Sequence, residues 1–278
     1  MKLAFLTVLL MFGTCIRAAL PQFIAETPTL LLLPRADGNQ ATGSGFIYET
    51  TNKQFLITAK HVLFDIASTN KPLPLISTNL IIIGWRDGAQ VRFDYNLDAY
   101  YKQNEVRISQ TRDVAVLALG TRIDGNRFGF DTRFTKWTGG GLSRSYPTAG
   151  VRKLDAVSVG QDVFTFGYPT SVGTEQNRQL DPLRPLARRG IVADKDTGRR
   201  QIILDVPVYG GNSGGPVIVM DEIAPQSYNF TVIGIIIEFV PFEDVWESKR
   251  FKGMSHVTWS NSGYSIVEPI ESALELLW

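Results

Sequence analysis

Apolar residues in this chain come in short runs, rich in isoleucine, valine, phenylalanine and tyrosine and separated by glycine, proline, asparagine and aspartate. Runs of about four to eight such residues, bounded by turn formers, indicate strands rather than helices. We therefore predict an all-β fold. The clearest runs lie at residues 45–48, 55–58, 80–85, 114–119, 163–166, 202–206, 216–220 and 232–237.

Two local signals refine this prediction. The dipeptide Asp87-Gly88 lies between apolar runs and tolerates the positive φ of a tight hairpin turn, so it predicts a β-hairpin. Pro269 at the start of the last segment favours a short C-terminal helix. It is followed by apolar residues at helical spacing, namely Ile270, Ala273, Leu274 and Leu277.

A glycine-rich, weakly periodic stretch near the middle of the chain separates two strand-rich halves. We predict a first β domain at residues 20–125, a connection at 126–150, and a second β domain with the terminal helix at 151–278. The alternative is a long surface loop within one domain.

The N-terminal segment reads as a targeting sequence. Lys2 precedes an apolar run that extends to Ile16, and Arg17-Ala18-Ala19 follows, which is the pattern of a secretory signal peptide at residues 1–19. The run is shorter than the roughly 20 residues that cross a bilayer, and an uncleaved anchor is the alternative. We therefore expect a secreted or periplasmic protein.

Composition restricts the possible partners and cofactors. The chain carries 28 basic and 27 acidic residues, so it lacks the long-range field that attracts nucleic acid or an anionic membrane. Its single cysteine, Cys15, lies in the leader, and it has only two histidines, His61 and His256. We predict no disulfide, no metal and no cofactor; the oligomeric state is open.

Three segments carry candidate chemistry. Ser213 is enclosed by glycines in Gly210-Gly211-Asn212-Ser213-Gly214-Gly215, a setting in which the amides of Gly211 and Ser213 can converge on one oxyanion. His61 follows a predicted strand, and a serine nucleophile requires a base of this kind. Asp113 begins another apolar strand and can orient an imidazole. Each feature alone also has a plain structural explanation.

Together the segments Thr58-Ala59-Lys60-His61, Asp113-Val114-Ala115-Val116-Leu117 and Gly211-Asn212-Ser213-Gly214-Gly215-Pro216 resemble the signatures of trypsin-like (chymotrypsin-fold) serine peptidases, in that family's order. The resemblance covers roughly residues 28–270. It implies two six-stranded antiparallel β-barrels with the site between them. It also implies a secreted serine endopeptidase acting on polypeptides through an acyl-enzyme, with His61 as base, Asp113 as its orienter, Ser213 as nucleophile and the Gly211 and Ser213 amides as oxyanion hole.

The sequence departs from the digestive enzymes of that family at several positions. Asn212 replaces the aspartate that pairs with a freed α-amino group, so we expect no zymogen of that type. The pattern is closer to bacterial HtrA-like or glutamyl-endopeptidase-like secreted members, and no PDZ domain is expected.

Ser262, Gly263 and Tyr264 resemble the segment that walls the primary pocket, and they are predicted to bind substrate. Val208 near that pocket favours an apolar or small residue before the cleaved bond, and a glutamyl preference assisted by His256 is the alternative.

Two functions from other classes remain at this level. One is a non-catalytic binding module on a protease scaffold. The other is an esterase of the α/β-hydrolase type, in which Ser213 sits in a Gly-x-Ser-x-Gly elbow and His256 is the base.

Overall fold

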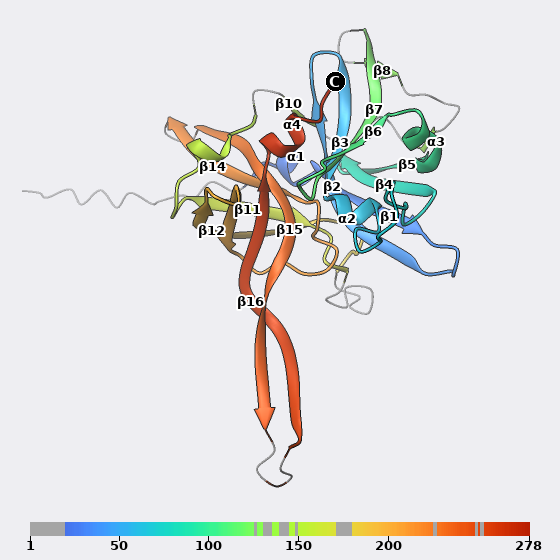
Figure 1. Cartoon of the computed structure of the whole chain (residues 1–278). Coiled ribbons are helices and arrows are strands. Elements are labelled where there is room, and N and C mark those ends of the chain that lie inside the picture. The colour runs from blue at the N-terminus through green and yellow to red at the C-terminus, as the bar shows by residue number, and fades with distance from the viewer. Residues whose placement is uncertain are drawn as a thin grey trace, which may run out of the picture.

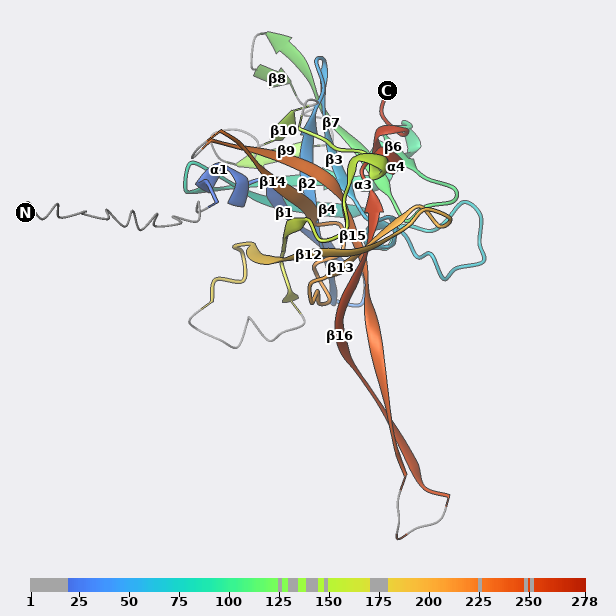
Figure 2. The same ribbon diagram turned by 90° about the vertical axis from the view of Figure 1, so that its left-hand side faces the viewer.

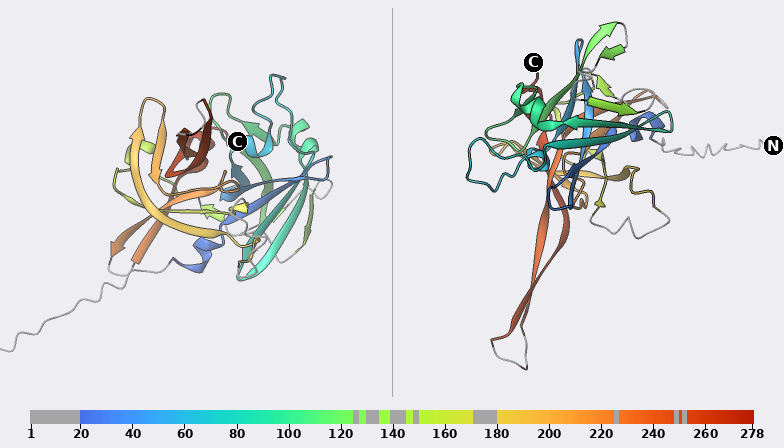
Figure 3. Two further views of the ribbon diagram at one scale, coloured as in Figure 1. Left: turned by 90° about the horizontal axis from the view of Figure 1, so that it is seen from below. Right: turned by 90° about the vertical axis from the view of Figure 1, so that its right-hand side faces the viewer.

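Strands dominate the computed structural model of the chain, which describes residues 20–124, 127–129, 135–138, 145–147, 150–170, 180–224, 227–247, 250 and 253–278. The predicted all-β fold is confirmed. The strands form two lobes that lie side by side (Figure 3). The predicted signal segment, 1–19, lies outside the described residues.

The first lobe is a curled ten-stranded sheet. Its strands are β1 (Pro28–Pro34), β2 (Gln40–Glu49), β3 (Lys53–Thr58), β4 (Asn79–Arg86), β5 (Ala89–Asn96), β6 (Val106–Ile108), β7 (Ala115–Asp124), β8 (Arg127–Gly129), β9 (Thr135–Thr138) and β10 (Ser145–Pro147). The main path runs β6-β7-β3-β2-β1-β4-β5-β9, with β10 on β2 and β8 on β7. The predicted hairpin is present, because β4 and β5 meet at Asp87 and Gly88, both with positive φ.

The second lobe is a closed six-stranded barrel, paired in the order β11-β12-β13-β16-β15-β14. Figure 1 labels the strands β11, β12, β14, β15 and β16 of this barrel. Its strands are β11 (Asp162–Gly167), β12 (Leu186–Asp196), β13 (Gln201–Asp205), β14 (Pro216–Ala224), β15 (Ser227–Glu247) and β16 (Ser255–Pro269). Short helices complete the described fold: α1 (Gln22–Ala25), α2 (Lys60–Leu63), α3 (Leu97–Lys102), a 3₁₀ turn (Leu154–Ala156) and α4 (Glu271–Leu274), which is the predicted C-terminal helix. Among the described residues no helix has the length and hydropathy to cross a bilayer.

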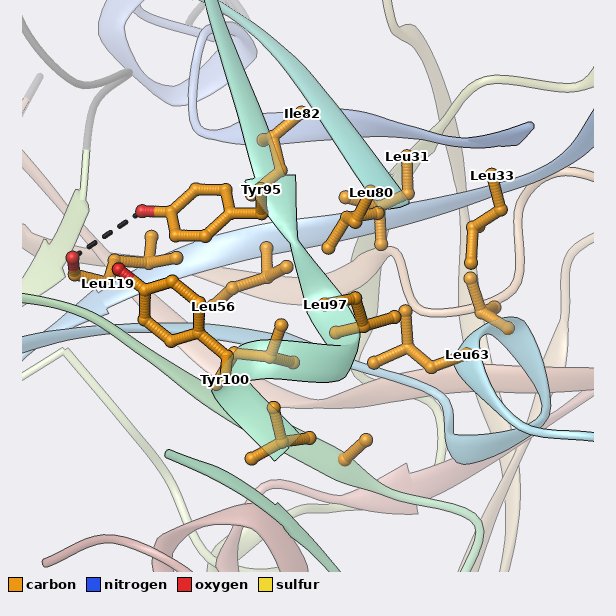
Figure 4. Packing of buried hydrophobic residues seen from close by; sticks show 14 of the residues in the cluster. Leu31, Leu33, Leu56, Leu63, Leu80, Ile82, Tyr95, Leu97, Tyr100 and Leu119 are labelled. Atoms are coloured by element: carbon orange, nitrogen blue, oxygen red, sulfur yellow. Dashed lines mark hydrogen bonds between the residues drawn. The ribbon is translucent and has the colours of Figure 1, made fainter. Parts of the chain in front are cut away.

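The central strands β2 and β3 and the first half of β7 are buried on both faces, which explains why they appear in the sequence as continuous apolar runs. Side chains alternate across a strand. On β2, Ile47 therefore packs into the core of the first lobe (Figure 4 shows part of this core), while Phe46 and Tyr48 pack against the second lobe. The cluster that contains Phe46 and Tyr48 also contains Phe166 of β11 and Ile270 before α4, so one hydrophobic cluster joins the two lobes.

The stretch 126–150, predicted as a connection, contributes strands to the first lobe. Strand β8 pairs with β7, β9 pairs with β5, and β10 pairs in parallel with β2. Their sequences are short and polar, so no apolar period marks them as strands.

Candidate active site

The loop around Ser213 connects β13 to β14 and is shaped by glycines. Gly211 and Gly214 have φ values of +97° and +88°. A Cβ on Gly211 would collide with the carbonyl oxygen of Tyr168, and one on Gly214 with that of Ser44. Only glycine fits both positions, so the backbone turns sharply on each side of Ser213.

This loop is fastened to the first lobe through Ser44 of β2. The Ser44 amide donates to the carbonyl oxygen of Ser213 (2.8 Å). The Ser44 hydroxyl donates to the carbonyl oxygen of Gly211 (2.7 Å) and accepts from the amide of Tyr168 (3.0 Å). Ser44 is fully buried, so these bonds fix the direction of the peptide groups around Ser213.

The amides of Gly211 and Ser213 are the predicted oxyanion donors. Within the described ranges neither amide donates a hydrogen bond to another group of the protein. Both therefore remain available to an oxygen atom of a ligand.

His61 lies in α2, directly after strand β3, as the sequence predicts. Its Nδ1 is 2.6 Å from Oδ2 of Asp113, and its backbone amide donates to Oδ1 of the same carboxylate (2.9 Å). The two contacts hold the imidazole at both ring and backbone, and the carboxylate selects the tautomer with a proton on Nδ1.

Burial by itself raises the pKa of Asp113, but the hydrogen bonds and charge of His61, together with the charge of Lys60, lower that pKa below its usual value. Asp113 is thus an anion in the folded protein.

Lys60 is a supporting residue that the sequence analysis missed. Its ammonium group donates to the carbonyl oxygens of Ser109 (2.8 Å) and Arg112 (2.7 Å). These bonds fix the turn that leads into Asp113. A lysine beside the candidate histidine was visible in the sequence, but nothing there indicated which carbonyl groups it would reach.

The structure brings the three segments to one junction between the lobes. A Cβ on Gly214 would lie 3.0 Å from the backbone nitrogen of Ala59, two residues before His61. The Ser213 loop is therefore packed against the end of β3, from which α2 carries His61.

A small, mostly apolar pocket of about 160 Å³ opens beside Ser213. It is lined by Val208, Tyr209, Gly210, Ser213, Ile236, Ile237, Glu238 and Phe239. A second hollow, of about 490 Å³, lies on the other lobe, where His61, Arg35 and Ile76 contribute to its wall. The two hollows border the candidate serine and histidine respectively.

Two sequence-based assignments fall elsewhere. Ser262, Gly263 and Tyr264 lie on β16 and do not contribute to the Ser213 pocket; Ser262 donates to the carbonyl oxygen of Val240 on β15. Their role in substrate binding remains a prediction.

His256 is exposed and pairs with Trp246 near the far end of the β15–β16 hairpin (Figure 1). A glutamyl preference assisted by His256 has no support in this position. The α/β-hydrolase alternative is wrong, because the fold is all-β and Ser213 is followed by a strand instead of a helix.

Comparison with known proteins agrees with this architecture. The family profile of the trypsin-like peptidase domain matches residues 43–222, well over half of the chain. A search of curated proteins finds no match.

Several solved structures are similar, all at low sequence identity. The thermostable serine protease AL20 from an extremophilic microorganism has a TM-score of 0.50 at 12% identity, over 91% of this chain and 96% of that one. A serine endoprotease from Yersinia pestis has a TM-score of 0.47 at 16% identity, over 90% of this chain but only 61% of that one. The protease Anisep from Arthrobacter nicotinovorans has a TM-score of 0.46 at 14% identity, over 88% and 90% of the two chains.

The AL20 comparison shows a shared fold, and the profile match extends from β2, before His61, to β14, beyond Ser213. The chain therefore belongs to the trypsin-like peptidase family, the serine proteases of chymotrypsin fold, which act on polypeptides.

Proposed function

We propose that the protein is a serine endopeptidase that cleaves peptide bonds through Ser213, His61 and Asp113. The observation that carries this proposal is the double contact of Asp113 with the ring and backbone of His61, next to the loop of Ser213. Nε2 of His61 makes no hydrogen bond within the part of the chain that the structure describes, so it can act as a base.

The reaction follows from these groups. His61 accepts the hydroxyl proton of Ser213 as Oγ attacks the carbonyl carbon of the substrate. Asp113 stabilises the imidazolium that forms. The amides of Gly211 and Ser213 donate to the developing oxyanion, and each such donor contributes roughly 10²- to 10³-fold in rate. His61 then protonates the leaving amine, and water hydrolyses the acyl-enzyme by the same route in reverse.

No proteolytic activation of the digestive type is required in this proposal. Asn212 is buried, and its side-chain Oδ1 accepts a hydrogen bond from the backbone amide of Tyr209 (3.0 Å). The backbone amide of Asn212 donates to the carbonyl oxygen of Tyr209 (2.9 Å). The loop before Ser213 is thus closed on itself.

We also propose that the segment 1–19 exports the protein; the mass of the protein recovered from outside the cytoplasm tests this.

A fluorophosphonate probe tests the catalytic proposal, because it labels only an activated serine. We expect the wild-type protein to be labelled, Ser213→Ala to be unlabelled, and His61→Ala to react orders of magnitude more slowly. His256→Ala is the matched control and should react like the wild type. If the correctly folded wild-type protein shows no labelling, the chain is a non-catalytic binding module on the same scaffold.

A further inference from the structure

The distal half of the β15–β16 hairpin projects from the body of the molecule (Figure 2). We call this part the arm: residues 239–247 of β15 and 255–261 of β16. It is a two-stranded ribbon whose register runs from Pro241 opposite Asn261 to Glu247 opposite Ser255. Such a ribbon is at best marginally stable alone in water, so a partner that covers it would stabilise it.

The arm exposes large apolar side chains on both of its faces. Phe242 is 56% exposed, Val245 53%, Trp246 62% and Trp259 63%. Aromatic side chains bury about 150–250 Å² each when a partner covers them. An apolar surface of this kind marks a binding site.

Charge narrows the choice of partner. Strand β15 carries four acidic residues from the pocket outward, namely Glu238, Glu243, Asp244 and Glu247. The basic residues Lys249, Arg250 and Lys252 stand in the sequence between the two strands of the arm. An anionic lipid surface would be repelled along most of the ribbon, whereas an extended partner that carries lysine or arginine among apolar residues matches it.

The arm is continuous with the candidate active site. The pocket beside Ser213 is lined by residues 236–239 of β15, and the arm begins where this lining ends. Strand β14 pairs with β15 only as far as Ile235. Beyond Ile236, no strand in the described part of the chain covers this edge of β15, so its backbone can accept a further strand.

One side chain fixes the base of the arm to the pocket, and another joins the two strands of the hairpin at that base. Asn261 donates from Nδ2 to the carbonyl oxygen of Val208, a pocket residue (2.5 Å). Ser262 donates to the carbonyl oxygen of Val240 (2.7 Å). A polypeptide bound along the arm is thereby held in a defined register with Ser213.

We propose that the arm is a docking track for the polypeptide substrate: it binds an extended segment, rich in apolar and basic side chains, that flanks the bond to be cleaved. The segment adds as a strand to the free edge of β15. Its apolar side chains pack against Phe242 and Trp246 on one face, and its cations pair with Glu243 and Glu247 on the other face. This inference rests on the proposed peptidase function and assigns its substrate class.

Binding can be measured without catalysis in the Ser213→Ala protein. The probe is a fluorescein-labelled peptide of about twenty residues in which lysine alternates with leucine or phenylalanine, and fluorescence anisotropy gives its Kd. We expect Phe242→Ala/Trp246→Ala and Glu243→Lys/Glu247→Lys, each added to Ser213→Ala, to raise the Kd at least tenfold. The matched control is Ile223→Ala, which removes an equally exposed apolar side chain outside the arm.

Unchanged affinity in both arm variants would overturn the proposal. So would a peptide in which glutamate replaces lysine if it bound equally well. Two other outcomes would overturn the proposal in a protein that does not bind the lysine peptide. Self-association that depends on the arm, measured by analytical ultracentrifugation, would assign the arm to a second copy of the chain. Flotation with phosphatidylglycerol vesicles that depends on the arm would assign it to a lipid surface.

Kinetics with active protein separates this inference from the proposed function. The ratio of kcat/KM for a long substrate to that for a four-residue substrate with the same cleaved bond should fall at least tenfold in the arm variants and stay at the wild-type value in Ile223→Ala. If neither substrate is cleaved while the arm variants still bind the lysine peptide more weakly than the protein with an intact arm does, the catalytic proposal fails and the docking track stands. An unchanged ratio would refute the track.

Discussion

Ser44 shows how one buried hydroxyl can control a catalytic loop. Two hydrogen bonds of the Ser44 hydroxyl and one of its backbone amide join β2 of the first lobe to the backbone of Gly211, Tyr168 and Ser213 in the second. The sequence around it, Gly43-Ser44-Gly45, contains no apolar period and no catalytic motif. Its role becomes visible only when the lobes are packed.

Replacing Ser44 with alanine should therefore impair catalysis more than folding. The variant leaves the Gly211 carbonyl oxygen and the Tyr168 amide without this partner, at a cost of about 1–3 kcal/mol in unfolding free energy. Because the Gly211–Asn212 peptide loses the anchor that follows the Gly211 amide, the loop holds this amide less rigidly toward the oxyanion, and we expect kcat to fall at least tenfold with little change in KM. Steady-state kinetics measures both, and Ser44→Thr, which retains a hydroxyl, is the comparison. A rise in KM as large as the fall in kcat would contradict the proposed role of Ser44 in holding the oxyanion loop.

Glu268 of β16 is a buried carboxylate beside the candidate catalytic pair, and only 3% of it is exposed. Burial raises its pKa, and the nearby charge of Asp113 adds to this rise, while Arg112 (3.8 Å) and a hydrogen bond from the Asp113 amide oppose it. Since the folded state binds the proton of Glu268 more tightly than the unfolded state does, stability is lost as the pH rises from the usual glutamate pKa through the raised one.

Glu268→Gln should remove this pH dependence, because its amide oxygen can still accept from the Asp113 amide but does not ionise. We expect the unfolding free energy of the variant, relative to that of the wild type, to become larger as the pH rises from 4 to 8. Urea unfolding at several pH values measures it. A difference that is constant across this range would show that ionisation of Glu268 does not differ between the folded and unfolded states.

At the scale of elements, β12 and β13 illustrate how tightly the second barrel is closed. A Cβ on Gly190 of β12 would collide with the carbonyl oxygen of Asp205 and the side chain of Val206. Gly190→Ala should therefore lower the unfolding free energy by about 1–3 kcal/mol, the usual cost of overpacking. Gly198→Ala, in an exposed turn with φ outside the positive range, should change it by less than about 0.5 kcal/mol. Equal effects in the two variants would contradict this account.

Most elements that frame the site were predictable from local sequence. The apolar runs predicted strands because β2, β3 and β7 are buried on both faces, and Asp87-Gly88 predicted its hairpin from backbone preference alone. Strands β8, β9 and β10 were missed because tertiary pairing, not periodicity, forms them. The arm was missed because its strands mix exposed aromatic and acidic residues, and Pro241 interrupts the pattern.

Some residues of the candidate site were predictable from the sequence, and others became visible only in the folded chain. His61 and Asp113 were predicted to meet across 52 positions of sequence, and the structure brings them together. Ser44, Lys60 and Glu268 were not predicted, since their partners are backbone groups that only the folded chain brings near. The first lobe also differs from the expected six-stranded barrel, because its sheet contains ten strands.

At the scale of the whole molecule, the hydrophobic cluster between the lobes determines how the protein unfolds. Phe166 of β11 is 1% exposed and belongs to this cluster together with Phe46 and Tyr48 of the first lobe. Neither lobe can lose its partner without exposing these side chains to water. We therefore expect both lobes to unfold in one transition, with the candidate catalytic pair and the Ser213 loop lost together.

Phe166→Ala tests this coupling. A phenylalanine removed from a packed core costs about 3–5 kcal/mol, and because the cluster is shared, the loss should appear equally in every probe of unfolding. Urea transitions followed by far-ultraviolet circular dichroism and by tryptophan fluorescence should coincide and shift together to lower urea concentration. Phe242→Ala on the exposed arm, the same substitution outside the core, should leave the midpoint within error. Two separate transitions in the wild-type protein would mean that the lobes fold independently and that the shared cluster does not couple them.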